Sequence, residues 1–470
     1  VPICAESEAV GMVIIMKKSD SFRDFAKYAS LNVMGMIGLS CYILADTFFV
    51  SQGLGTNGLT ALNLAIPVYS FIHGSGLMIG MGGGTRYSIL KSCSDPVEAN
   101  PTFTEAVVLA AIFAVLFLLV GIFCSGAIVS LFGADENVFV MSETYLRVIL
   151  LFAPAFLLNN VLLCFVRNDG APQRSMAAMI GGSLSNVALD WFFIFPLQMG
   201  IFGAAFATGL APLISMLILS PHFFRKRNGF RLVKCRPAGK RLAGILSSGV
   251  PSLVTEASSG IVMIVFNAII LELEGNPGVA AYGVIANLSL VIIAIYTGIA
   301  QGIQPLISRD YGRNNDAGIR AVLRYAMIAM LVFSVLIYLG VLFGAPQIAG
   351  IFNREHDAVL QGIAEEGLRL YFSACPFVGF NIVLSMYFTS LEHPKSAHLI
   401  SLLRGFLIML PTVFLFSRIW GIRGVWCAFP AAEFIVAAVG ITLFLAMKKK
   451  HAAIGKSRQS SSISSVKKQL

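Results

Sequence analysis

Two aspartates lie in stretches of the chain that are apolar enough to cross a membrane. Asp46 lies in LSCYILADTFFV, with Tyr42 one helical turn before it, and Asp190 lies in SLSNVALDWFFIF, four residues after Asn186. Side chains four residues apart share one face of a helix. An ionisable side chain at membrane depth is costly and usually marks an ion or substrate path. The two carboxylates therefore predict a site that binds protons or cations.

The rest of the chain has the composition of a polytopic membrane protein. Of its 470 residues, 57% are hydrophobic and 12% are charged, whereas soluble domains carry about 25% charged residues. A spanning helix needs about 20 apolar residues, and twelve such segments occupy most of the chain. The net charge of +10 comes from residues between these segments. We attribute it to orientation in the membrane and expect no nucleic-acid partner.

We predict an all-α protein with twelve spans in two lobes of six. The candidate spans are residues 27–51, 59–88, 103–131, 143–166, 174–198 and 202–224, then 241–272, 277–308, 318–344, 360–389, 396–417 and 421–447.

These spans divide the chain into five segments. They are a cytoplasmic N-terminal segment (residues 1–26), an N-lobe (27–224), a basic cytoplasmic linker (225–240), a C-lobe (241–447) and a Ser-rich basic tail (448–470). We expect the tail to be disordered and cytoplasmic, because it is polar and lacks a hydrophobic face. Residues 1–15 fit no span, and we interpret Met16 as the natural start.

The basic residues fix the orientation of the spans. One set of alternate loops, which includes both termini, carries 28 of the 34 lysines and arginines, while the opposite set has only Arg354, Arg418 and Arg423. Cytoplasmic loops are the ones enriched in lysine and arginine. Both termini are therefore predicted to be cytoplasmic, which requires an even number of spans.

The chain also repeats itself at an offset of about 222 residues. Matching pairs are Pro154 and Pro376, Asn159 and Asn381, Pro172 and Pro394, and, at an offset of 221, Gly200 and Gly421. Two six-span halves have the same orientation, so they are related by a pseudo-two-fold axis along the membrane normal. Transporters built this way bind substrate between their halves.

The repeat fails at the acidic residues. Asp46 falls on Asn267, and Asp190 falls in a stretch of the second half, residues 407–412, that carries no charge. The second half forms without these carboxylates, which favours a function for them over a buried structural role. For Asn160, Asn186 and Thr208, hydrogen bonding between helices is an equally good interpretation.

The second half has polar residues of its own. Glu256 and Asn267 are eleven residues apart, which places them on the same face of one helix. Their role is left open between structure and transport. Arg404 and Glu433 have opposite charges in adjacent spans, and we predict a structural ion pair between them, since pairing lowers the cost of burying both.

Several sequence patterns that would indicate enzymes are missing. The glycine run GMGGGT is not followed by lysine, and the sequence contains no HExxH and no GxSxG. The eight cysteines form no CxxC pair, so neither a zinc site nor a disulfide framework is expected. We expect no cofactor apart from a coupling ion.

Several motifs resemble those of one transporter family. DTFFVSQGLG, FVRNDGAPQRSM, SNVALDWFFIFPLQMGIFGAAFAT and GIAQGIQPLISRDYGRNN occur in the order and spacing of the multidrug and toxic compound extrusion (MATE) transporters, and the likeness covers nearly all of residues 22–447. It is closest to the bacterial MepA-like and DinF-like members.

The resemblance implies two six-helix lobes around a V-shaped cavity in the bacterial inner membrane. It implies a monomer, surrounded by lipid, that exports lipophilic and often cationic drugs in exchange for H⁺ or Na⁺. The positions that match the ion-binding cluster of DinF-like members are Asp46, Asn186, Asp190 and Thr208, which would also hold Na⁺, with Tyr42 and Asn160 nearby.

Two other functions remain open at this point. A flippase of lipid-linked oligosaccharides would need a cavity rich in arginine and lysine to hold pyrophosphate, yet Arg404 is the only basic residue predicted deep within a span. A membrane-embedded aspartyl enzyme would use Asp46 and Asp190 as its acid pair. Activity without an ion gradient would distinguish an enzyme from a transporter.

Overall fold

In a computed structural model, the structure describes residues 3–93, 99–224, 228–353 and 357–469. Arg354 and residues 225–227 of the predicted linker lie outside these ranges. The first half of the described chain contains α1 (Ile3–Ser92), α2 (Ala99–Phe123), α3 (Ser125–Leu131), α4 (Glu136–Leu151), α5 (Ala153–Asn168), α6 (Pro172–Ile194) and α7 (Gly200–Phe224). The second half contains α8 (Gly239–Gly312), α9 (Asp316–Phe352), α10 (Ala358–Tyr371), α11 (Cys375–Ser390), α12 (Pro394–Leu402) and α13 (Met409–Gln469).

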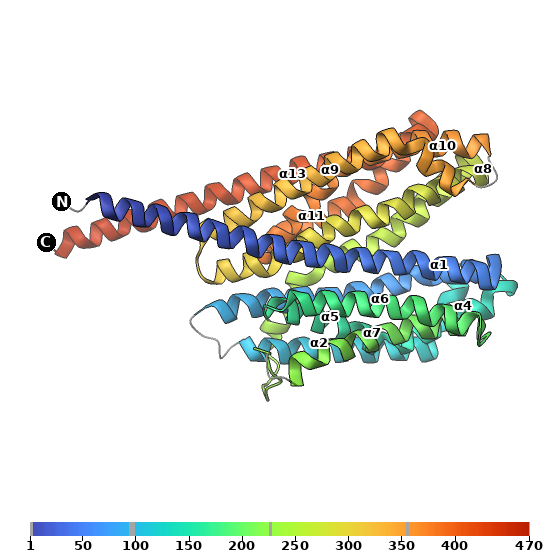
Figure 1. The fold of residues 1–470 in the computed structure, drawn as a ribbon, viewed down its shortest axis with the longest axis horizontal. Helices are drawn as coiled ribbons and strands as arrows, with labels where there is room; N and C mark the ends of the chain where they lie inside the picture. The colour runs from blue at the N-terminus through green and yellow to red at the C-terminus, as the bar shows by residue number, and fades with distance from the viewer. Residues whose placement is uncertain (1–2, 94–98, 225–227, 354–356, 470) are drawn as a thin grey trace.

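The three longest helices are each interrupted by one glycine. Gly55 in α1, Gly275 in α8 and Gly421 in α13 have φ of 65°, 64° and 57°, and the chain turns back after each (Figure 1). Eight described helices or helix runs are long and apolar enough to cross a membrane, and α4 with α5, bent by 46°, makes a ninth. Since the three interrupted ones cross twice, the structure has the twelve predicted spans.

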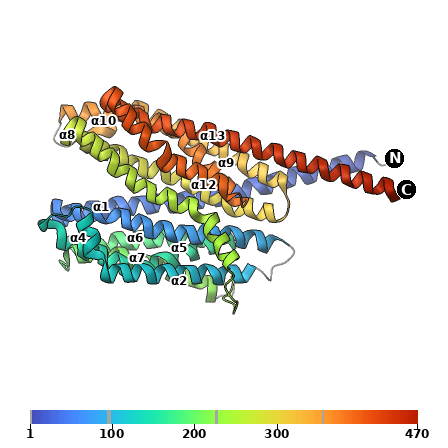
Figure 2. The same cartoon turned by 180° about the vertical axis from the view of Figure 1, so that it is seen from behind.

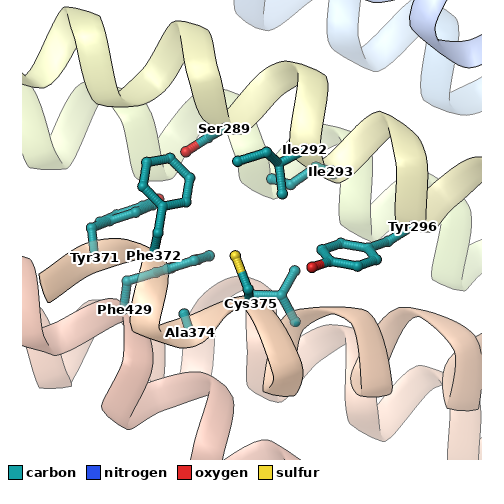
Figure 3. A pocket seen from close by; sticks show the side chains of 10 residues that line it. Ser289, Ile292, Ile293, Tyr296, Tyr371, Phe372, Ala374, Cys375 and Phe429 are labelled. Atoms are coloured by element: carbon teal, nitrogen blue, oxygen red, sulfur yellow. The ribbon is translucent and has the colours of Figure 1, made fainter. Parts of the chain in front are cut away.

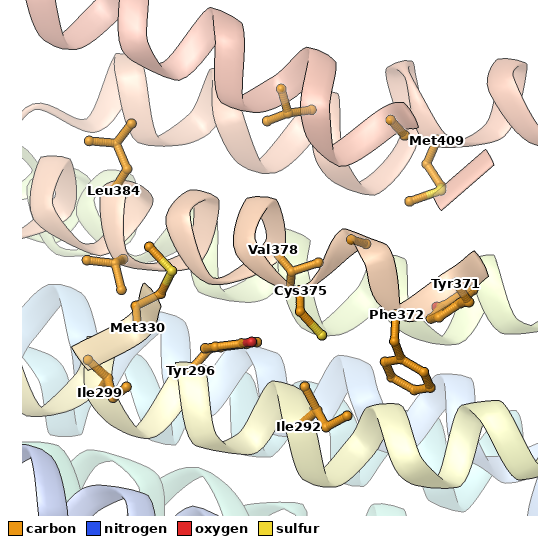
Figure 4. Close-up of a cluster of buried hydrophobic side chains, with 14 of the residues drawn as sticks. Ile292, Tyr296, Ile299, Met330, Tyr371, Phe372, Cys375, Val378, Leu384 and Met409 are labelled. Atoms are coloured by element: carbon orange, nitrogen blue, oxygen red, sulfur yellow. The ribbon is translucent and has the colours of Figure 1, made fainter. Parts of the chain in front are cut away.

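The spans form two lobes with separate cores. One buried cluster includes Ile72, Leu157 and Ala204 from the first half of the chain. The other belongs to the second half, where Tyr296, Met330 and Val378 pack together (Figure 4), and it also takes in Phe25 and Tyr28 from the start of α1. As a result, α1 runs between the two lobes, as both views of the fold show (Figures 1 and 2).

The backbone carries the predicted repeat. Gly55 and Gly275 have nearly equal angles (φ 65°, ψ −158° and φ 64°, ψ −153°), and Gly200 and Gly421 have φ of 61° and 57°. Because non-glycine residues rarely adopt positive φ, the matching positions show that each half turns its chain with the same local geometry.

The lobes meet tightly at the end of the molecule that holds both termini (Figure 1). A Cβ atom on Gly302 of α8 would lie 2.8 Å from the Cα of Ala29 in α1, so no larger residue fits there. Nearby, the Ser88 hydroxyl donates to the carbonyl of Pro305 at 3.3 Å. Termini at one end agree with an even number of spans, while the assignment of that end to the cytoplasm stays a prediction.

The described part of the linker packs against the first lobe. The Asp169 carboxylate accepts from the backbone N–H of Gly229 at 2.7 Å and from Lys91 at 2.5 Å. Phe230 is fully buried in the first core. One backbone donor, the N–H of Gly229, and one aromatic anchor, Phe230, therefore fix the start of the segment that connects the lobes.

The structure differs from the sequence prediction in the C-terminal tail. Residues 448–469 were expected to be disordered, but α13 continues through them to Gln469. Extending an existing helix adds one hydrogen bond for each residue fixed and avoids the cost of nucleation. The tail contains no proline to stop this extension.

Replacing Gly55 tests whether the reversal in α1 depends on its positive φ. A Cβ there would meet nothing within 4 Å, so Gly55→Ala acts through backbone strain alone and should cost about 1–3 kcal/mol. Gly340 in α9 also has free space around it but lies in regular helix, so Gly340→Ala should be neutral or stabilise by up to about 1 kcal/mol. Thermal unfolding of the detergent-solubilised variants measures both. Equal melting temperatures for Gly55→Ala and Gly340→Ala would show that the reversal does not depend on the positive φ of Gly55.

Candidate functional site

The two aspartates singled out from the sequence meet inside the first lobe. Asp46 comes from the first span of α1 and Asp190 from α6, and their side chains are 7% and 0% exposed. Their carboxyl groups are close enough to influence each other's charge. Two carboxylates in a buried site repel each other when both are ionised. The pair therefore suits a site that binds a proton or a cation.

Two further predicted residues surround Asp190. The amide nitrogen of Asn186 donates to Asp190 Oδ2 at 3.0 Å, and its oxygen accepts from the Thr208 backbone N–H at 3.3 Å. With the amide reversed, Nδ2 would instead donate to Thr208 Oγ1 at 3.4 Å. The first orientation supplies the buried acid with a donor, as a buried carboxylate requires. Helices α6 and α7 are thus tied together beside the acid pair.

The cluster has free oxygen atoms for an ion. Oδ1 of Asp46 and Oδ1 of Asp190 are buried and have no hydrogen-bond partner. Such atoms are rare in proteins, and a bound ion or proton would satisfy them. Carboxylate, amide and hydroxyl oxygens suit hard cations, so the residues present fit Na⁺ as well as H⁺. No described group of three or more His, Cys, Asp or Glu residues could hold a metal ion.

Tyrosines complete the cluster, and the sequence analysis identified only one of them. The hydroxyl groups of Tyr42 and Tyr69 are 2.8 Å apart. Tyr145, from α4, is buried next to Thr208 and the two aspartates. Spacing within one helix pointed to Tyr42, whereas Tyr69 and Tyr145 lie on other spans. Only the packing of those spans brings them here.

A partly open cavity lies next to the acid cluster. Its wall contains Tyr42 and Thr208, which also belong to the cluster, together with Asn160. Most of the wall comes from the first lobe, and Gln301 of α8 contributes from the second. The cavity and the acid pair therefore share residues, although the pair itself does not line the cavity.

Arg167 corrects one sequence assignment. It was placed in a loop outside the spans, but α5 continues to Asn168 and buries its side chain at 1% exposure. Its guanidinium donates to Asn32 at 2.9 Å and to Gln301 at 2.7 Å. Hydropathy places the end of a helix only to within about one turn. Here one extra turn of α5 moves Arg167 from the surface into the interior, where it joins the two lobes.

The second lobe contains the predicted ion pair. Arg404 Nε lies 2.5 Å from Glu433 Oε1, and Asn381 donates to Glu433 Oε2 at 2.7 Å. Arg404 sits in a π-helical segment, Leu403–Leu407, between α12 and α13. Both Arg404 and Glu433 therefore have their partners within the second lobe.

The second lobe also contains a crevice. It runs between α8, α10 and α11 (Figure 3). Tyr371 and Phe429, which line it, stack with ring centres 4.3 Å apart. The pseudo-symmetric halves therefore differ in character, with a polar cluster and a cavity in one and packed aromatic rings in the other.

The remaining predicted residues lie apart from the acid pair. Glu256 is on α8, and its Oε2 is 3.5 Å from Nδ1 of His73. Asn267 is half-buried further along α8. Among the described residues, neither Glu256 nor Asn267 bonds to Asp46 or Asp190. The two sets of candidates thus belong to different places in the molecule.

Comparison with known proteins gives consistent matches along the chain. The MatE family model matches residues 33–192 and 251–415. The multidrug export protein MepA of Staphylococcus saprophyticus is 24% identical over 92% of this chain and 96% of its own length. MepA of Staphylococcus aureus MSSA476 is 22% identical over the same shares.

Solved structures agree with this match. An outward-facing multidrug resistance MATE transporter of the MOP superfamily is 25% identical, with a TM-score of 0.85 over 92% of this chain and 96% of that one. A MOP superfamily transporter from Pyrococcus furiosus, whose reversed binding-pocket polarity suggests a different function for it, is 24% identical, with a TM-score of 0.85 over 91% and 96% of the chains.

Removing Glu433 should destabilise the protein. Glu433→Ala leaves Arg404, which is 14% exposed, without its counter-charge, and breaking a buried pair in this way costs about 3–5 kcal/mol. The matched control is Glu366→Ala, which breaks an ion pair with Arg423 whose side chains are 40% and 71% exposed and should cost less than about 1 kcal/mol. Thermal unfolding in detergent compares the two. If Glu433→Ala and Glu366→Ala unfold at the same temperature, the Arg404–Glu433 pair does not stabilise the protein.

Proposed function

Because the chain belongs to the MatE family, we propose that it is a secondary antiporter that exports lipophilic, often cationic compounds in exchange for H⁺ or Na⁺. The observation that carries the proposal is the buried Asp46–Asp190 pair beside a cavity with which it shares neighbouring residues. The MepA relatives are multidrug export proteins, which supports the same activity here.

Coupling would work through the residues that the cavity and the acid pair share. Binding of H⁺ or Na⁺ changes the net charge of the pair, and Tyr42 and Thr208 lie between that charge and the cavity. An ion shifts a conformational equilibrium only if it prefers one state. The buried, partly unpartnered oxygens of Asp46 and Asp190 would make the ion prefer the conformation in which they remain buried. If the substrate prefers the other conformation, ion and substrate exclude each other.

The two alternatives receive less support. A lipid-linked oligosaccharide flippase needs several basic groups for pyrophosphate, but Arg167 is the one arginine or lysine among the described residues that line the cavity, and its contacts are with neutral side chains. The relatives and structural neighbours are exporters and transporters, so the aspartyl enzyme is set aside. We place the antiporter in the bacterial plasma membrane with both termini in the cytoplasm.

Asp46→Asn should abolish gradient-driven export while leaving the protein folded. Asparagine keeps the shape of the side chain but neither takes up a proton nor supplies a negative charge. Efflux by Asp46→Asn should therefore no longer respond to the imposed gradient. The measurement is dye efflux by reconstituted vesicles under an imposed proton or sodium gradient, and comparison of the two gradients identifies the ion.

A matched control keeps this test specific. Asp135 is exposed and caps the N-terminus of α4, and asparagine caps helices about equally well. Asp135→Asn should therefore transport normally. Wild-type transport by Asp46→Asn would move the coupling site to the second lobe, where Glu256 is the next candidate.

A further inference from the structure

Arg167 is a buried cation whose partners, within the described part of the chain, are all uncharged. Its side chain is 1% exposed. It contacts the amide oxygens of Asn32 and Gln301 and the sulfurs of Met81 and Cys164. Arginine stays protonated in proteins, and buried charges are normally paired. The site therefore carries one positive charge that a bound anion would balance.

One edge of the Arg167 guanidinium is poorly satisfied. Nη1 donates at 2.9 Å to Asn32 and at 2.7 Å to Gln301. Nη2 has the sulfurs of Met81 at 3.1 Å and Cys164 at 3.5 Å, and sulfur is a weak acceptor. Nε is buried and has no hydrogen-bond partner among the described residues. Nε and Nη2 form one side of the planar fork, and a carboxylate matches such a side with two parallel hydrogen bonds.

This edge adjoins the cavity of the first lobe. Arg167 and two of its partners, Cys164 and Gln301, line that cavity, and Asn159 and Asn160 add amide groups to its wall. Among the described residues that line it, none is an aspartate or a glutamate. A positively charged group in the cavity thus has no counter-charge on the wall, whereas a negatively charged group has Arg167.

We propose that Arg167 binds a carboxylate group on the compounds that this protein exports. Nε and Nη2 donate to the two carboxylate oxygens in place of their contacts with sulfur, while Nη1 keeps its bonds to Asn32 and Gln301. The substrates recognised in this way are lipophilic acids and zwitterions, and a zwitterion also carries a cationic group. The inference rests on the proposed function in one respect, namely that the cavity takes up lipophilic compounds.

The partners of Arg167 connect this site to both lobes. Arg167 is on α5 in the first lobe, Asn32 is on α1, and Gln301 is on α8 in the second lobe. A carboxylate bound to the Nε and Nη2 edge fixes the plane of the guanidinium, so Nη1 stays directed at Gln301. The bound anion and the contact between the lobes therefore support each other.

A purely structural tie between the lobes is the other role that Arg167 could have. That role needs only the bonds from Nη1 to Asn32 and Gln301. It leaves the Nε and Nη2 edge unused, and it makes no distinction between an acid and the ester of the same acid. The two roles therefore predict different binding behaviour.

The first test compares an acid with its own ester. Rhodamine B carries a free carboxylate beside a cationic ring system, and its ethyl ester has the same ring system without the negative charge. Each dye is titrated into purified full-length protein in detergent, with binding to empty micelles subtracted and fluorescence anisotropy as the signal. The wild type should bind rhodamine B about tenfold more tightly than the ester, because hydrogen bonds to a charged group are worth at least that much.

The second test changes the guanidinium. Arg167→Gln has neither charge nor fork and should lose the preference for the acid. It should bind the ester as the wild type does, which also shows that the variant is folded. Arg167→Lys keeps the charge without the planar fork and should retain only part of the preference. Arg324→Gln, the same change at an exposed position of α9, is the control and should bind both dyes like the wild type.

The outcomes separate this inference from the proposed function. If the wild type binds neither rhodamine B, nor its ester, nor the neutral lipophilic dye Nile red, the proposed function itself is wrong. If the wild type binds Nile red but binds rhodamine B no more tightly than the ester, only the role of Arg167 is overturned. An Arg167→Gln protein that keeps the preference for the acid would overturn it as well. If both Arg167 variants fail to fold, the comparison of acid and ester in the wild type decides.

Discussion

Every charge within the apolar part of this protein needs a partner from the protein, since lipid offers none. The structure meets this constraint in three ways. Asp46 and Asp190 are buried near each other, where a proton or a cation would relieve their repulsion. Arg404 meets the carboxylate of Glu433, whereas Arg167 has only neutral oxygen and sulfur partners. The first arrangement changes its charge when an ion binds, which suits coupling, while the Arg404–Glu433 pair suits stability.

This constraint also explains the difference between the two halves. They share their turns, down to the angles at Gly55 and Gly275, because both must cross the membrane with the same connections. They do not share Asp46 and Asp190, whose counterparts in the second half are uncharged. The second half packs rings such as Tyr371 and Phe429 against each other beside its crevice. A common scaffold therefore carries unequal chemistry.

Much of this could be predicted from the sequence, since lipid imposes simple rules. Hydropathy identified the spans, and the failure of the repeat at Asp46 and Asp190 identified the acid pair. The contact of Arg404 with Glu433 followed from opposite charges in neighbouring spans. In contrast, Arg167 was missed because a single helical turn decides whether it is in a loop. Tyr145 and His73 could not be assigned, because their partners come from the packing of distant spans.

The close approach of α1 and α8 has a mechanical consequence. At Gly302 and Ala29 the two backbones nearly touch, with no long side chains between them that could stretch or change rotamer. Close-packed interfaces of this kind tend to hold or to separate as a unit and are not continuously deformable. The protein would therefore open at this end in a single step, and the contact between α1 and α8 would have two states, packed and separated.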